Sequence, residues 1–170
     1  GFGKTTLLSE WLAGYERPAA WLSLDEEDND ATRFWTYLIT ALQTVYADLG
    51  QSTQEMLKGS QPPPVQSVLT PLLNDIAVLP KPLALVLDDY HVISSKAIHD
   101  GLAFLLDHQP HQLHLVVSTR ADPPLPVSRL RARGQLTEMR ADDLRFTSTE
   151  AATFLNEAMG LGLALKDVQA

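Results

Sequence analysis

The strongest constraint on the fold is a continuous apolar run, Leu83 to Leu87, that ends at Asp88 and Asp89. A strand with no polar face has to be covered on both sides, which is the position of a central strand in a parallel sheet. Amphipathic helical patterns lie on either side of this run, at about Val65 to Leu79 and after Ser95. The sequence therefore predicts an α/β fold with a mostly parallel sheet and helices on both faces.

Further elements follow from the same patterns. Apolar runs predict buried strands at Ala19 to Leu24 and Leu113 to Thr119, and a shorter strand is expected at Gln135 to Met139. Helical spacing predicts a helix from about Lys4 to Ala13 and another after the capping residue Asp30. Helical patterns separate the long strands, as the crossovers of a parallel sheet require.

Two segments complete the domain plan. Gly50 to Pro64 is polar and ends in three prolines, so it predicts an exposed loop or insertion rather than an element. Thr147 and Glu150 match a capping box that opens a helix at Ala151 to Met159. We expect one main domain at residues 1–140, and the start of a following helical segment at residues 141–170.

The opening residues fit a loop that binds phosphate. They match the closing half of G-x-x-x-x-G-K-[ST], in which glycines let backbone N–H groups surround phosphate oxygens. Within this motif, Lys4 is expected to reach the β- and γ-phosphates and Thr5 to place its hydroxyl on Mg²⁺. Because the first half of the loop and the strand before it are missing, the expected fold is an N-terminally truncated P-loop NTPase. An ordinary glycine turn that caps a helix stays open. The candidate nucleotide-binding residues are Gly1, Phe2, Gly3, Lys4, Thr5 and Thr6.

The acids after the apolar run would supply the second part of such a site. A carboxylate at a strand end that faces Mg²⁺ is the Walker-B arrangement, which makes Asp88 a metal-ligand candidate together with Thr5. Asp89 is a candidate catalytic residue that would polarise the attacking water. A capping or turn aspartate explains either acid taken alone. The two motifs in this order favour a nucleotide site over coincidence.

Arg120 is the second candidate catalytic residue. It follows the predicted strand that ends at Thr119, and open α/β sheets present ligand-binding groups at such ends. An arginine there would sense the γ-phosphate or stabilise the charge that develops on it. A structural ion pair, for example with Asp122, explains Arg120 equally well. A solvated or interdomain face is expected for the arginines that follow, Arg129, Arg131 and Arg133.

Other suggestive residues fit structural roles. Asp25 lies at a strand end, where it would approach a nucleotide, but the solvated start of a helix explains its acidic neighbourhood. Core packing is expected of the three tryptophans, Trp11, Trp21 and Trp35. A metal site is not expected of three histidines that have neither a helix to align them nor a carboxylate cluster nearby, His108, His111 and His114.

Composition and charge narrow the classes of function. The formal net charge of −8 opposes binding to DNA and to anionic membranes. The chain has no cysteine, which excludes disulfides and thiolate metal sites and makes the cytoplasm the default location. No apolar run approaches the roughly 20 residues of a membrane span. Signatures of GTPases (Asn-Lys-x-Asp) and transport ATPases (Leu-Ser-Gly-Gly) are also missing.

The distinctive blocks of the chain run from Gly1 to Trp11, Ala20 to Asp25, Asp28 to Asp30, Phe34 to Leu38, Leu85 to His91, Ser118 to Pro126 and Asp143 to Thr147. With these blocks the sequence resembles the STAND-class signalling ATPases, and within them the MalT-like, large LuxR-type transcriptional regulators. The phosphate loop is shared by many ATPases, whereas the aromatic and acidic second block and the Arg-Ala-Asp-Pro-Pro-Leu-Pro block are more specific. The resemblance covers nearly the whole chain.

This resemblance implies an ATP-dependent switch that rests with ADP, exchanges it for ATP when an inducer binds, and then self-associates. DNA binding is implied only for a C-terminal helix-turn-helix that this sequence lacks. The implied cofactors are ATP or ADP with Mg²⁺, and hydrolysis, if it occurs, is expected to be slow. A P-loop metabolic kinase and a nucleotide-independent interaction scaffold stay open as alternatives.

Overall fold

The computed structural model describes residues 4–59, 63–140 and 143. The chain divides into two compact units, Thr5–Leu136 and a second unit formed by Gly1–Lys4 and Thr137–Ala170. Every strand and helix that the structure describes belongs to Thr5–Leu136, except for Lys4, the first residue of the first helix. The helix predicted at residues 151–159, with its capping box, lies outside the described residues.

Strands and helices alternate along the first unit. The strands are β1 (Ala19–Ser23), β2 (Leu83–Asp88) and β3 (Leu113–Val117). The α-helices are α1 (Lys4–Ala13), α2 (Ala31–Gln43), α3 (Gln51–Leu57), α4 (Val65–Ala77), α5 (Lys96–Asp107) and α6 (Val127–Ala132). Short 3₁₀ helices follow two of the strands, η1 (Glu26–Asn29) after β1 and η2 (Tyr90–Val92) after β2. Among the described helices, none has the length and apolar character of a membrane span.

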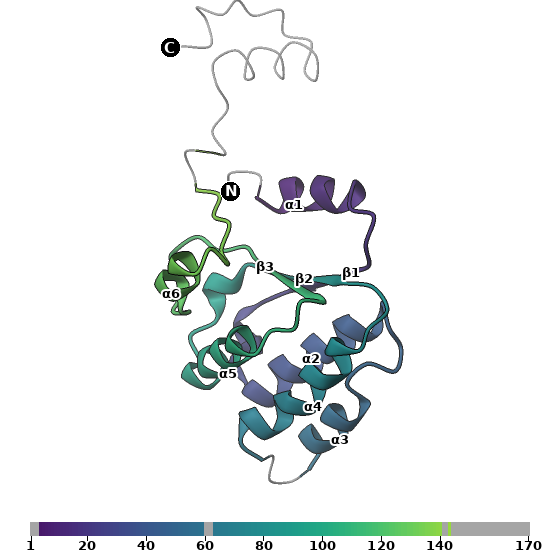
Figure 1. Cartoon of the computed structure of the whole chain (residues 1–170). Helices are drawn as coiled ribbons and strands as arrows, with labels where there is room; N and C mark the ends of the chain where they lie inside the picture. Colours follow the sequence, from purple (N-terminus) through teal and green to yellow (C-terminus); the bar gives the residue numbers. More distant parts are fainter. Residues whose placement is uncertain (1–3, 60–62, 141–142, 144–170) are drawn as a thin grey trace, which may run out of the picture. The chain divides into compact units, whose positions relative to one another are not determined.

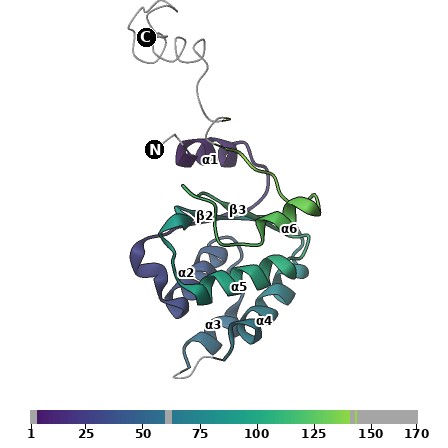
Figure 2. The same cartoon turned by 90° about the vertical axis from the view of Figure 1, so that its left-hand side faces the viewer.

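The strands form one parallel sheet in the order β1-β2-β3. All six residues of the central strand β2 are buried, as its apolar sequence requires. Figures 1 and 2 show α2, α3, α4 and α5 on one side of this sheet and α1 on the other. The predicted α/β fold with a parallel sheet is therefore confirmed.

The hydrophobic core lies between the sheet and the helices α2, α4 and α5. Trp35 of α2 is 2% exposed and packs edge-on against Phe34, so its predicted core role is confirmed. Trp21 is half-buried, and its indole N–H donates to the Ser23 hydroxyl. The prediction for Trp11 is wrong, because α1 has no buried residue and Trp11 is 40% exposed.

The prediction of a loop at residues 50–64 is wrong for the first half of this segment, which forms α3. Gly50 begins this helix with φ +70°, a conformation that glycine adopts without steric cost. The space is also closed to a side chain, because a Cβ on Gly50 would lie 3.0 Å from Leu72 Cδ1 and 3.1 Å from Ile39 Cγ2. Packing against α4 stabilises this polar segment as a helix. Two of its side chains are buried, Thr53 and Leu57.

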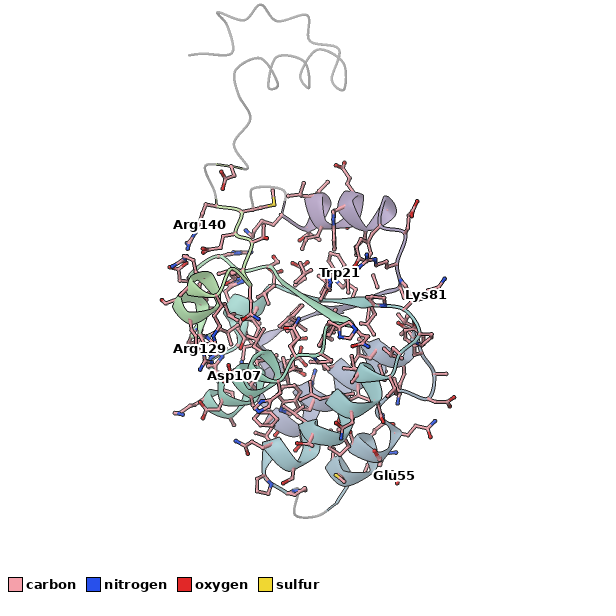
Figure 3. The ribbon with its side chains drawn as sticks, viewed as in Figure 1. Trp21, Glu55, Lys81, Asp107, Arg129 and Arg140 are labelled. Atoms are coloured by element: carbon pink, nitrogen blue, oxygen red, sulfur yellow. The ribbon has the colours of Figure 1, made fainter. Side chains whose placement is uncertain are left out.

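The strand predicted at residues 135–139 is also wrong, because this segment has no regular structure. A Schellman motif ends α6 immediately before it: Gly134 adopts φ +65°, and the Gln135 N–H donates to the Leu130 carbonyl. The arginine-rich segment, in which no element was predicted, forms the short helix α6. Its Arg129 pairs with Asp107 of α5, and Figure 3 shows the two side chains together.

Gly101→Ala is expected to lower the free energy of unfolding by at least about 1 kcal/mol, even though alanine is the better helix former by about that amount. The added Cβ would overlap Cζ2 of Trp35, which is buried and cannot move without repacking the core. Urea unfolding measures the change. Gly14→Ala is the control, since its Cβ meets no atom closer than 3.8 Å. Equal stabilities of the two variants would contradict the packing argument.

Candidate functional site

The predicted site lies at the carboxyl edge of the sheet, where β2 ends. Ser23 of β1 pairs in register with Asp88, so the loops that follow these strands start side by side. The backbone joins them to the central strand: the Leu24 N–H donates to the Asp88 carbonyl, at 3.1 Å. On the other side, the Tyr90 N–H donates to the Ser118 carbonyl at 2.8 Å. Three loops therefore converge at this edge.

Thr5 and Asp88 meet at this edge, although 83 residues separate them in the sequence. The Thr5 hydroxyl donates to Oδ2 of Asp88 at 3.0 Å. The other carboxylate oxygen, Oδ1, accepts the Asp89 N–H at 3.1 Å. Because Asp88 is only 3% exposed, these two donors fix a buried carboxylate. The result is a hydroxyl and a carboxylate oxygen side by side, the kind of ligand that hard cations prefer.

The other residues of the predicted phosphate loop lie close to Thr5 in the sequence. Lys4 is the first residue of α1 and is half-buried, and Thr6 is exposed in the same turn. Gly1, Phe2 and Gly3 lie outside the described residues. The observed contact therefore joins one member of the predicted phosphate loop to the predicted metal-binding acid.

Asp89 adopts a left-handed conformation, with φ 57° and ψ 35°. It is the only non-glycine residue with positive φ among those that the structure describes. Backbone strain of this kind costs of order 1–3 kcal/mol and is common at functional sites. The Asp89 side chain is 43% exposed, and its Oδ1 lies 3.6 Å from Nδ1 of His91. A solvent-accessible carboxylate therefore stands directly after the buried one.

Arg120 lies in the bend that follows β3 and is exposed. Pairing of β2 with β3 places the two strand ends at the same edge of the sheet, so Arg120 belongs to the same loop cluster as Asp88. Its predicted roles, beside the γ-phosphate or in a structural ion pair such as one with Asp122, stay predictions. No contact joins Arg120 to the two acids.

Sequence reasoning missed Ser118, whose side chain is 5% exposed at the end of β3. Its hydroxyl has no hydrogen-bond partner within the described part of the chain. An unsatisfied buried hydroxyl costs about 1–3 kcal/mol, so a polar atom of a ligand at this edge would be favoured. The available signal was a serine at the end of an apolar strand that faces the acidic strand end.

The acidic run after β1 is a capping network. Asp25 begins η1, and its carboxylate accepts the Glu27 N–H at 2.8 Å. Asp28 completes a capping box by accepting the Asp25 N–H, and it also accepts from the Arg33 guanidinium at 3.2 Å. Asp30 caps α2 as predicted. The view of this run as simply solvated is therefore wrong for Asp28, which is 2% exposed.

Tyr90 and His99 form a polar pair behind the acidic strand end. The Tyr90 hydroxyl lies 2.6 Å from Nδ1 of His99 in α5. Burial raises the pKa of Tyr90, so its hydroxyl keeps its proton in this pair. Burial also lowers the pKa of His99, an effect that the Asp100 carboxylate partly opposes. This pair therefore fastens the start of η2 to α5.

The described residues contain no group of three or more His, Cys, Asp or Glu side chains that would hold a metal ion. A cation bound beside Asp88 would therefore need further oxygen atoms, from a ligand or from water. Mg²⁺ is commonly bound in this way, through one or two carboxylates together with the phosphates of a nucleotide. Together, the parallel sheet and the contact between a helix-start threonine and an acidic strand end define a P-loop NTPase-like α/β domain.

Comparison with known proteins shows that the chain is similar to a segment of regulators that share one name. It is 42% identical over 156 residues to the HTH-type transcriptional regulator MalT of Cronobacter sakazakii. It is 41% identical over the same length to the proteins of that name from two strains of Klebsiella pneumoniae. These alignments cover 92% of the chain but 17% of each relative, so the chain corresponds to a segment of them. No family model matches.

His99→Gln is expected to reduce the loss of stability on acidification from about pH 7.5 to about pH 5.5. The pKa of His99 is lower in the folded protein than its unfolded value of about 6.5, so the unfolded state takes up the proton first. The wild-type protein therefore loses stability as the pH falls through the unfolded pKa. Thermal unfolding at both pH values measures this loss. His111→Gln, at an exposed position, is the control.

Proposed function

We propose that this chain is the ATP-binding switch module of a signal-responsive transcriptional regulator. The observation that carries the proposal is the hydrogen bond from Thr5 Oγ1 to Asp88 Oδ2 at 3.0 Å. It joins the end of a phosphate-loop motif to the acid of a Walker-B strand. The relatives, named as HTH-type transcriptional regulators, support the regulatory role.

The oxygen pair fits Mg²⁺. Two neighbouring ligands of an octahedral Mg²⁺ with metal–oxygen distances of about 2.1 Å lie about 3.0 Å apart. The Thr5 and Asp88 oxygens already have that separation. In the proposed site these two residues would hold the ion, and its further oxygen ligands would come from phosphate and water. The ion supplies positive charge against the phosphate oxygens.

Other residues of the chain have defined roles in this proposal. Lys4 and the N-terminus of α1 contact the nucleotide phosphates, and the opening Gly1, Phe2, Gly3 and Thr6 complete the loop. Asp89 orients the attacking water through its exposed carboxylate. Arg120 stabilises the charge that develops on the γ-phosphate. Hydrolysis is slow, because a switch depends on which nucleotide is bound.

In the whole protein, we propose that ATP binding promotes self-association, and that a separate helix-turn-helix domain binds DNA in the cytoplasm. The net charge of −8 supports this division of labour, since this chain would repel the DNA phosphates. An inducer that favours the ATP-bound state would shift the equilibrium by the difference in its affinity for the two states.

Lys4→Ala is expected to weaken ATP binding at least about tenfold, because it removes a charge-assisted contact worth roughly 1.5–3 kcal/mol. Asp88→Asn should abolish the gain in ATP affinity that Mg²⁺ provides. Calorimetric titration of the full-length protein with ATP, with and without Mg²⁺, measures both effects. Lys58→Ala, at an exposed position after α3, is the matched control. Wild-type binding by Lys4→Ala, or no binding by the wild-type protein, would favour the interaction scaffold.

Arg120→Ala is expected to lower the rate of ATP hydrolysis about 10²–10³-fold and to leave ATP affinity nearly unchanged, because the proposed contact forms as charge develops in the transition state. Single-turnover phosphate release and equilibrium binding separate the two quantities. Arg133→Ala, an exposed arginine after α6, serves as the control. Unchanged hydrolysis by Arg120→Ala would remove this residue from the site, and transfer of phosphate to an added metabolite would favour a kinase.

A further inference from the structure

Asn29, the last residue of η1, connects two loops at the carboxyl edge of the sheet. Its side-chain amide donates to the Glu26 carbonyl within its own loop and to the Val92 carbonyl at the end of η2, both at 3.0 Å. Its Oδ1 accepts the backbone N–H groups of Ser94 at 2.6 Å and Ser95 at 3.0 Å. The Ser94 hydroxyl donates to the same oxygen at 3.2 Å. One side chain therefore bridges positions 63 to 66 residues apart.

This arrangement is specific for an asparagine. A primary amide has two N–H donors and one carbonyl oxygen, and here both donors and the oxygen are used. An aspartate would keep the acceptor but would set a negative charge against the carbonyls of Glu26 and Val92. An alanine at position 29 would remove the side-chain hydrogen bonds to the backbone of both loops. The contact is thus a property of this residue type.

The segment held by Asn29 includes the acids of the candidate site. Val92 closes η2, and its N–H donates to the Asp89 carbonyl at 3.1 Å. Asp89 begins η2 in its left-handed conformation, and its N–H donates to the Asp88 carboxylate. An unbroken series of hydrogen bonds therefore runs from Asn29 to the carboxylate that contacts Thr5.

The other end of the segment is fastened independently. The Tyr90 N–H donates to the Ser118 carbonyl, and its hydroxyl bonds to His99. These bonds hold the start of η2. The end of η2 at Val92 and the residues before α5 are held by hydrogen bonds to Asn29. Ser95 precedes α5 without a side-chain cap of its own, and Asn29 is the acceptor for its N–H. Asn29 thus joins the loop between β2 and α5 to the loop that follows β1.

We propose that Asn29 is a positioning residue for the metal-dependent part of the nucleotide site. It acts through the backbone of η2: by holding Val92, it maintains the left-handed Asp89 and the orientation of the two acids. It makes no contact with the nucleotide. This inference rests on the proposed function, because it assigns Asn29 a role in the chemistry of that site.

The test uses Asn29→Asp and Asn29→Ala in the full-length protein, with Asn74→Asp as the matched control on the exposed face of α4. ATP affinity is measured with Mg²⁺ and with EDTA, and kcat and KM are measured for hydrolysis. We expect both Asn29 variants to lose at least about fivefold of the Mg²⁺-dependent gain in affinity and of kcat, with the alanine variant the more affected. ATP affinity in EDTA should stay within about twofold of wild type, because the phosphate loop supplies it.

Several results would overturn the inference. Equal losses of affinity with Mg²⁺ and with EDTA would mean that Asn29 only stabilises the fold. Wild-type values in both Asn29 variants, with ATP binding lost in Lys4→Ala, would reject this role and leave the proposed function standing. Retained ATP affinity in Lys4→Ala would reject the proposed function and the inference with it. If the alanine variant does not fold, Asn29→Asp, which keeps the acceptor oxygen, decides the question.

Discussion

Burial of β2 on both faces is the requirement on which the other elements depend. Its six residues are all buried, so a strand is needed on each edge and helices are needed above and below. Full burial of one leucine or valine side chain contributes about 1.5–3 kcal/mol, and β2 carries several of them. The helices α2, α4 and α5 complete this burial on one face. Because the strand is parallel to both neighbours, its acidic end is placed where the loops after all three strands converge.

The sequence predicts what depends on this apolar run and on local spacing. The three strands, α1, α2, α4 and α5 and the cap at Asp30 could all be recognised because apolar periodicity and capping chemistry act within a few residues. The predictions fail where contacts between residues far apart in the sequence determine the local structure. α3 forms in a polar segment because Gly50 fits between Leu72 and Ile39, which no local pattern reveals. The segment after α6 is not a strand, because the Schellman motif at Gly134 redirects the chain.

The same distinction applies to the candidate site. Asp88 and Thr5 were predictable by type and by motif, and their contact at 3.0 Å joins the two predicted motifs. The roles of Lys4, Asp89 and Arg120 stay predictions. Asn29 and Ser118 were missed for a physical reason: a single asparagine in an acidic run has no local signature. The hydrogen-bond partners of Asn29 lie partly in another loop. The Ser118 hydroxyl is notable only because it is buried without a partner among the described residues.

Helix α1 differs from the rest of the unit, because none of its residues is buried, yet its second residue bonds to the acidic strand end. A helix with so little buried apolar surface opens locally at a lower free-energy cost than the core helices do. Any anion that binds at its N-terminus must then also order it, and part of the binding energy is consumed in doing so. Under the proposed function, occupancy of the loop and the ordering of α1 are linked equilibria.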